Sequence, residues 1–168
     1  MQKMTNNQLS EALAQRFSNQ ILAREALYDC LVIEVQPDFV FELIQSLKND
    51  AELSFDFLTL IGGVHYPENT DRELAVVYHL HSWKNTIRLR IKAYVPAANP
   101  TIKSVTSLFE TANWMERETF DFFGIQFEGH PNLTRILNMD EMDYHPMLKE
   151  FPLEDGTRED KDDRFFGR

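Results

Sequence analysis

The stretch ERETFDFFGIQFEGHP, residues 116–131, gathers the side chains of acid–base chemistry: carboxylates, an arginine and a histidine. On a helix, Glu118 and Asp121 are three positions apart and share a face, while Arg117 and Asp121 are four apart and can form an ion pair. Glycosidase-type catalysis instead needs two carboxylates held across a pocket, usually by different elements. The spacing therefore favours a structural role, in pairing and capping, for Glu116, Arg117, Glu118 and Asp121.

The histidines are the candidates for binding a metal ion. His79 and His81 alternate along a predicted strand, so that both side chains point to one face at a spacing that suits two zinc ligands. No HExxH sequence accompanies them, and a histidine pair on a surface-facing strand is common. The other candidates are His65, His130 and His145. We expect no metal site in this chain, and a stand-alone metal-dependent hydrolase built on His79 and His81 is the alternative from another functional class.

Motifs for nucleophilic catalysis and for cofactor binding are missing from the sequence. Cys30 is the only cysteine and lies in an apolar strand, where a thiol is usually inert. A single thiolate also cannot hold an iron–sulfur cluster, which needs several. The sequence has no GxSxG elbow, no GxGxxG loop and no GxxxxGK[ST] loop. It therefore predicts no catalytic residue, and no binding site for flavin, NADH or ATP, in this chain.

Composition and charge limit the possible partners. The 168 residues include 27 acidic and 17 basic side chains, which gives a net charge of −10. A nucleic-acid binder needs a basic surface to neutralise phosphates, so this balance argues against nucleic acid as a partner. No apolar run approaches the ~20 residues that span a bilayer, and the first residues lack the apolar core of a secretory signal. We therefore expect a cytosol-side protein that does not insert into a membrane.

Apolar periodicity indicates the elements that must position these residues. Helical spacing predicts helices over 5–17, over 37–50 and over 101–122, the last with a break near Asn113 and a cap at Gly124. Alternation predicts four strands, over residues 30–35, 53–66, 73–82 and 86–95. The second of these is expected to be interrupted at Gly62-Gly63, and the last two are expected to form a hairpin. The order predicts an α+β fold: a mostly antiparallel sheet with helices packed on one side.

The chain divides into two predicted parts. Residues 1–150 form a single α+β domain, and residues 151–168 form a charged, extended C-terminal arm. Six acids and four bases lie within residues 154–168, with almost no apolar periodicity, so the arm cannot bury enough surface to order itself. We expect it to lie across a partner, with Phe165 and Phe166 as anchors.

A basic stripe stands out against the acidic total. In TIRLRIKAYV, residues 86–95, Arg88, Arg90 and Lys92 share one face of a predicted strand and apolar residues share the other. The stripe is either a solvated face or a docking surface for an acidic partner, to which arginine offers planar, two-pronged contacts. The sequence leaves both interpretations open.

Two segments near the C-terminus resemble a known family. ANWMERETFDFFGIQFEGHPNLTRIL and YHPMLKEFPL closely resemble the signature of the 30 kDa subunit, or C subunit, of respiratory complex I, the proton-translocating NADH:quinone oxidoreductase. The resemblance is dense from Ser104 to Leu153 and combines ERE, DxxGI, FxGHP and a closing HP…KxFPL. Thr134 departs from the pattern, because the family commonly has two basic residues before the Ile-Leu pair and only Arg135 is basic here.

The resemblance implies a function for the whole chain. It implies a non-catalytic structural and assembly subunit in the peripheral arm of a complex that passes electrons from NADH through FMN and iron–sulfur clusters to quinone. It implies no cofactor in this chain, with FMN and the clusters in partner subunits. The implied partners are the large quinone-site subunit and the small iron–sulfur subunit, which hold the chain at the cytoplasmic face of the cell membrane. The equivalent subunit of a membrane-bound hydrogenase is the alternative within the superfamily.

The same resemblance points to a set of structural and interface residues. Our hypothesis is that the helix charges pair and cap so that the helix is held against the loop at residues 124–131. Glycine at two positions would permit backbone turns that other residues resist. The set is Glu116, Arg117, Glu118, Asp121, Gly124, Gly129, His130, Pro131, Arg135, His145 and Pro146.

Overall fold

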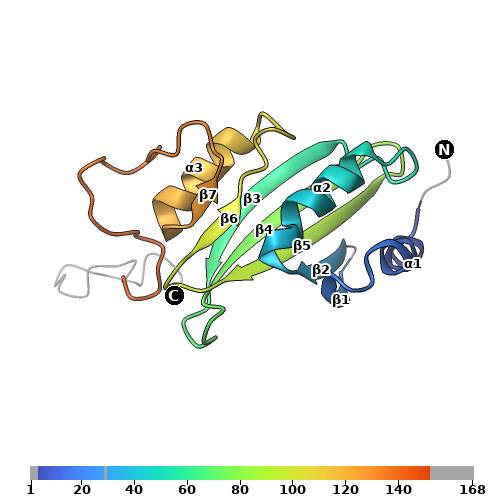
Figure 1. The fold of residues 1–168 in the computed structure, drawn as a ribbon, viewed down its shortest axis with the longest axis horizontal. Coiled ribbons are helices and arrows are strands. Elements are labelled where there is room, and N and C mark those ends of the chain that lie inside the picture. Colours follow the sequence, from blue (N-terminus) through green and yellow to red (C-terminus); the bar gives the residue numbers. More distant parts are fainter. Residues whose placement is uncertain (1–3, 29, 152–168) are drawn as a thin grey trace, which may run out of the picture.

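The computed structural model describes residues 4–28 and 30–151 (Figure 1). In chain order the elements are α1 Asn6–Phe17, β1 Ile21–Leu27, β2 Cys30–Val35, the 3-10 turn η1 Pro37–Phe39, α2 Val40–Asn49, β3 Phe57–His65, β4 Leu74–Ser82, β5 Ile87–Val95, β6 Thr101–Lys103, α3 Ala112–Phe123 and β7 Gln126–Glu128. Apart from Phe151, the predicted C-terminal arm lies outside the described residues, and so do its proposed anchors Phe165 and Phe166.

A five-stranded sheet in the order β1-β2-β5-β4-β3 is the frame of the described fold. β4 and β5 form the predicted antiparallel hairpin, which closes at the pair Ser82 and Ile87. β1 with β2 and β3 with β4 are also antiparallel, whereas β2 and β5 are parallel. A second, two-stranded sheet pairs β6 with β7 in parallel. The prediction of a mostly antiparallel sheet in an α+β fold is thus confirmed.

Local sequence signals explain where the first two helices begin. The Thr5 side chain accepts a hydrogen bond from the Gln8 amide, and the Gln8 side chain accepts one from the Thr5 amide. This capping box satisfies two amides that the first turn of α1 leaves without partners. Pro37 opens the η1 turn that leads into α2, where its missing N–H is no disadvantage. Both predicted helices are therefore confirmed.

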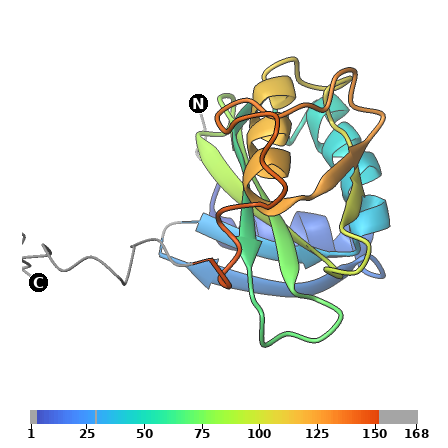
Figure 2. The same ribbon diagram turned by 90° about the vertical axis from the view of Figure 1, so that its left-hand side faces the viewer.

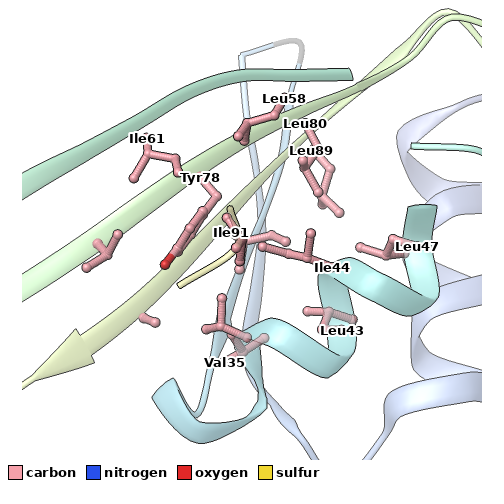
Figure 3. Packing of buried hydrophobic residues seen from close by; sticks show 14 of the residues in the cluster. Val35, Leu43, Ile44, Leu47, Leu58, Ile61, Tyr78, Leu80, Leu89 and Ile91 are labelled. Carbon is pink, nitrogen blue, oxygen red and sulfur yellow. The ribbon is translucent and has the colours of Figure 1, made fainter. Parts of the chain in front are cut away.

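The core lies between one face of the five-stranded sheet and the helices. In Figure 1, α2 lies across this face, and in Figure 2 α2 and α3 lie together on the same side of the sheet. Figure 3 shows three fully buried side chains of α2, Leu43, Ile44 and Leu47, directed toward the strands. Those strands supply Val35, Leu58, Ile61, Tyr78, Leu80, Leu89 and Ile91. The prediction that the helices pack on one side of the sheet is confirmed.

The predicted helix over residues 101–122 is wrong in its first half. Residues 101–103 form β6, turns follow, and α3 begins only at Ala112. Val105, Leu108 and Phe109 keep a helical spacing, but the Val105 amide donates to the side chain of Glu116 instead of to a helical carbonyl. A tertiary hydrogen bond therefore overrides the local pattern. Gly124 does end α3, in the left-handed conformation that was expected (φ 78°).

Two further expectations about strands need correction. β3 runs without a break through Gly62 and Gly63, and its irregularity lies between Leu58 and Leu60. Gly63 serves a different purpose, because a Cβ atom there would lie 2.4 Å from the ring of Phe123, so its bare backbone lets α3 approach β3. β1 was not predicted at all, because five of its seven residues are exposed and no alternation marks it.

Helix length bears on the question of membrane insertion. Within the described residues, no helix is both long enough and apolar enough to cross a bilayer.

Candidate functional site

Helix α3 positions most of the signature residues. Its packing against β3 fixes one side of the helix, and the segment at residues 132–148 folds along another side (Figures 1 and 2). We call this segment the docking segment, after the role that we propose for it. It has almost no regular secondary structure, so its backbone groups must find partners outside a ladder of helix or strand hydrogen bonds.

Asp121 supplies several of those partners. The carboxylate is fully buried, and its Oδ2 atom accepts hydrogen bonds from the amides of Ile136 (3.0 Å), Leu137 (2.8 Å) and Asn138 (2.9 Å). Its Oδ1 atom accepts from the Asn138 side chain at 3.0 Å and from Arg135 at 2.7 Å. One carboxylate therefore organises three consecutive amides of the docking segment.

Arg135 completes this network from the other side. Its side chain is only 10% exposed and forms an ion pair with Asp121. The guanidinium also donates to the main-chain carbonyls of Asp121, Met142 and Tyr144. A buried arginine matched by a carboxylate and by carbonyls joins distant points of the chain with directional contacts. Here those points are α3 and two positions further along the docking segment.

The pKa of Asp121 reflects this surplus of donors. Burial alone raises the pKa of a carboxyl, because it penalises the charged form. The amides of Asn138 and Leu137 and the side chains of Arg135 and Asn138 outweigh burial and hold the pKa of Asp121 well below its ordinary value. The group is therefore a charged structural centre at neutral pH.

Glu116, one and a half turns earlier on α3, is also fully buried but has fewer donors. Its carboxylate accepts from the Ser104 hydroxyl (2.6 Å) and the Val105 amide (2.8 Å), and so ties α3 to the turn after β6. Burial raises the pKa of Glu116 to about 7, and these two hydrogen bonds only partly oppose it. The buried hydroxyl of Tyr78 has no hydrogen-bond partner in the described chain, and burial followed by the Glu116 charge raises its pKa.

Two more signature residues, Arg117 and His145, bind the docking segment. Arg117 donates to the carbonyls of Thr134 and Arg135, so it does not form the predicted pair with Asp121. Because Thr134 contributes its carbonyl, the departure at this position does not disturb that contact. His145 donates from Nδ1 to the Asp121 carbonyl at 2.9 Å.

His130 acts on the loop before the docking segment. Its Nδ1 atom accepts from the Asn132 amide and its Nε2 atom lies 3.1 Å from the Asn113 carbonyl, which requires a neutral ring protonated at Nε2. It thereby joins the start of α3 to the start of the docking segment.

The glycines of the signature differ in their roles. Two features exclude a side chain at Gly124. Its φ angle is positive, and a Cβ atom there would lie 2.7 Å from the His145 ring. Gly129 also has a positive φ (83°) but faces open space. Pro131 is exposed and Pro146 half-buried.

The structure assembles only part of the predicted set. Glu118 is exposed and forms no hydrogen bond or ion pair with the described residues. The charged side chains of the helix contact the docking segment, whereas the loop at residues 124–131 contacts the helix through His130. Sequence reasoning missed Asn138 and Ser104, because each contacts its carboxylate across more than ten positions, and only a polar residue in the right place hints at such a contact.

Large apolar side chains remain exposed around this network. Leu137 is 64% exposed and Met139 70% exposed, although the backbone next to them is tightly held. Trp114, Tyr144 and Met147 are exposed as well. A rigid backbone that presents several apolar side chains is typical of a surface that contacts another protein.

The basic stripe lies on the sheet face opposite the core. Arg88 is exposed, and Arg90 and Lys92 are half-buried. His79, a former metal candidate, accepts a hydrogen bond from Arg90 at 3.0 Å, and burial, with help from Arg90 and Arg88, lowers its pKa. Within residues 4–28 and 30–151, no three His, Cys, Asp or Glu side chains gather in an arrangement that could hold a metal ion.

Comparison with known proteins agrees with the geometry. The family model described as the respiratory-chain NADH dehydrogenase 30 kDa subunit matches residues 33–157. The NADH-quinone oxidoreductase C subunit of Mycolicibacterium gilvum is 40% identical over 88% of this chain and 66% of its own length. The C subunit of Mycobacterium tuberculosis is 43% identical over 74% of this chain and 53% of its own length. The chain thus spans about half to two thirds of the length of these relatives.

Solved structures share the fold. A trypsin-resistant fragment of Nqo5 is 33% identical, with a TM-score of 0.64 over 74% of this chain and 98% of the fragment. A polypeptide of an archaeal membrane-bound sulfane sulfur reductase has a TM-score of 0.74 over 88% of this chain and 85% of its own length, at 22% identity, which shows the fold alone. The matched family model and the relatives of about 40% identity lead to one conclusion: the chain belongs to the 30 kDa subunit family of the respiratory-chain NADH dehydrogenase, the family of the NADH-quinone oxidoreductase C subunit.

Proposed function

We propose that this chain is a non-catalytic structural and assembly subunit in the peripheral arm of a proton-translocating NADH:quinone oxidoreductase. It docks on the large quinone-site subunit, next to the small iron–sulfur subunit, and these partners hold it at the cytoplasmic face of the cell membrane. FMN and the iron–sulfur clusters reside in partner subunits. The names of the relatives support the complex, and the lone cysteine supports the absence of a cluster in this chain.

One observation carries the docking role. Asp121 and Arg135 hold the docking segment in place through their ion pair. Leu137 and Met139, which follow Arg135 in this segment, nevertheless remain exposed to solvent. Fixing a segment by a buried ion pair while leaving its apolar side chains exposed gives no benefit to an isolated chain. It lowers the entropy lost on binding, because the segment is already ordered when a partner arrives.

Co-purification from gently solubilised membranes tests this proposal. A tagged chain should bring down large membrane subunits together with flavin, iron–sulfur signals and NADH:quinone activity. Leu137→Asp should reduce this recovery by about tenfold or more, because a charge would be buried at the contact. Leu22→Asp is the matched control, since Leu22 is 52% exposed on β1, away from the docking segment. Equal recovery of both variants would contradict the docking role.

The activity of the recovered complex identifies its electron donor. If the complex used hydrogen as its electron donor and did not oxidise NADH, the chain would instead be the equivalent subunit of a membrane-bound hydrogenase. A single soluble chain with a stoichiometric metal ion would instead favour the hydrolase alternative.

A further inference from the structure

The sheet has a second face, opposite the face that α2 and α3 cover (Figure 2). Successive side chains of a strand point to opposite faces of the sheet. Because Tyr78, Leu80, Leu89 and Ile91 point into the core, their neighbours along the strands point to this outer face. Strand pairing sets His79 opposite Arg90 and His81 opposite Arg88. The outer face is therefore a continuous surface across β5, β4 and β3.

This face carries an excess of positive charge in an acidic chain. Arg88 and Lys92 form no ion pair with the described residues, and Arg90 contacts the neutral imidazole of His79 instead of an acid. The neighbouring acid, Glu34, is already paired with Arg72 at 2.5 Å. The cations of β5 thus lack local compensation, although the chain as a whole has a net charge of −10.

An exposed aromatic cluster borders the cations. Trp83, 63% exposed, lies 5.7 Å from the ring of Phe57 and 4.7 Å from that of His81. Leu60, 47% exposed, continues the apolar area along β3. Tryptophan and arginine side by side are the residue types enriched where proteins bind one another most tightly.

A polar atom at this end of the face also lacks a partner. The Nδ1 atom of His81 is buried and has no hydrogen-bond partner in the described chain. His81 and Arg88 line a hollow between the hairpin end of the sheet and the start of α1, which adds Thr5 and Thr86. A carboxylate in this hollow would lie beside Arg88, whose guanidinium could donate hydrogen bonds to it.

We propose that the outer face is a second docking surface, separate from the docking segment, and that its occupant is an acidic polypeptide segment with an apolar side chain. This inference rests on the proposed function, because the segment comes from a neighbouring subunit of the complex. The carboxylates of the segment pair with Arg88, Arg90 and Lys92, and its apolar side chain packs on Trp83 and Phe57. An anionic lipid surface fits less well, because the net charge of −10 repels it.

Zero-length cross-linking of the intact complex tests the proposal. A carbodiimide joins the Lys92 amine to a carboxylate only where the two are in contact. Mass spectrometry should find Lys92 joined to an Asp or Glu of another subunit. Lys92→Arg keeps the charge and should remove this one cross-link while the complex stays assembled.

Charge reversal provides the matched comparison. Arg88→Glu should lower the yield of the Lys92 cross-link by about tenfold or more, because like charges then face one another. Lys103→Glu, on β6 beside Glu42, should leave the yield unchanged. An assembled complex with no cross-link at Lys92 would overturn this inference and leave the proposed function standing. Flotation of the full chain with phosphatidylglycerol vesicles, abolished by Arg88→Glu, would overturn it in favour of lipid.

Discussion

Glu116 and Asp121 are two fully buried carboxylates five positions apart on α3, yet their pKa values move in opposite directions. Asp121 has three amides, an asparagine side chain and an arginine around it, and its pKa is lowered. Glu116 has one hydroxyl and one amide, and its pKa rises to about 7. Both side chains lie on the same helix and are closed off from solvent, but Glu116 lies deeper inside the protein than Asp121.

The comparison teaches that the hydrogen-bond donors around a buried acid, together with its depth in the protein, decide its charge state. Removing a carboxylate from water penalises its charge, and only enough hydrogen bonds and an opposite charge restore it. The contacts of Asp121 at the end of α3 therefore depend on its negative charge, and we call this site the charged joint. The contacts of Glu116 near the start of α3 are most stable when the carboxyl group is neutral, and we call this site the neutral joint.

The largest expected effect comes from neutralising the charged joint. Asp121→Asn leaves the nearly buried Arg135 without a counter-charge and withdraws acceptors from the docking segment. Breaking one half of a buried pair typically costs about 3–5 kcal/mol, so we expect a loss of that size in the free energy of unfolding. Urea denaturation of the full chain measures it. A loss below about 1 kcal/mol would mean that Asp121 behaves as a surface residue.

Acid titration checks the same joint by another route. Because the folded pKa of Asp121 lies below its unfolded value, its stabilisation is fully present above the ordinary pKa and is lost as the pH falls. The stability difference between wild type and Asp121→Asn should therefore shrink below about pH 4. A difference independent of pH would show that shape, and not charge, holds the docking segment.

Glu116 should show the reverse dependence on pH. Its folded pKa, about 7, is above its ordinary value of 4.5, so its stabilisation is greatest at low pH and is lost as the pH rises through the interval between them. The shift corresponds to about 3 kcal/mol, since one pKa unit is about 1.4 kcal/mol. Relative to Glu116→Gln, which mimics the neutral acid, wild type should lose about this much stability between pH 4.5 and pH 7. Equal slopes for the two proteins would place Glu116 in contact with solvent.

Gly124 connects the charged joint to the end of the helix. Gly124→Ala combines a left-handed backbone with a Cβ atom 2.7 Å from the His145 ring, whose Nδ1 atom donates to the Asp121 carbonyl. We expect a loss of about 2 kcal/mol in thermal or urea unfolding. Gly129→Ala is the control, because it has the same sign of φ without the clash and should lose about 1 kcal/mol. Equal losses would remove His145 from the explanation.

Local patterns predicted the parts of this fold that are determined locally. The capping box of Thr5 and Gln8 and the alternation of β4 and β5 each lie within a few residues, and the helix and both strands were predicted in place. The turn after β6 was predicted as helix, because the hydrogen bond of Val105 to Glu116 joins residues eleven apart. Helical spacing alone gives no indication of such a bond.

The candidate site followed the same rule. Arg117 was predicted as the partner of Asp121 because the two are four positions apart, whereas the actual partner is Arg135, fourteen positions away. The family signature pointed to most members of the network, including Arg135, His130 and His145. It did not indicate their pairing, because pairing depends on the path of the docking segment, which has no periodic pattern.

The smallest expected effect concerns the Tyr78 hydroxyl next to the neutral joint, and it tests whether this hydroxyl forms a hydrogen bond with Glu116. The Tyr78 hydroxyl is fully buried beside Glu116 and has no partner within the described chain. Tyr78→Phe removes a polar group that gains nothing from the fold, so stability should stay within about 1 kcal/mol of wild type or rise slightly. The pH dependence assigned to Glu116 should persist in this variant, since burial is the main cause of the raised pKa of Glu116. A loss of about 2 kcal/mol or more at pH 5, absent at pH 8, would instead show that protonated Glu116 and Tyr78 share a hydrogen bond, and the two joints would then differ in their partners as well as in their charge.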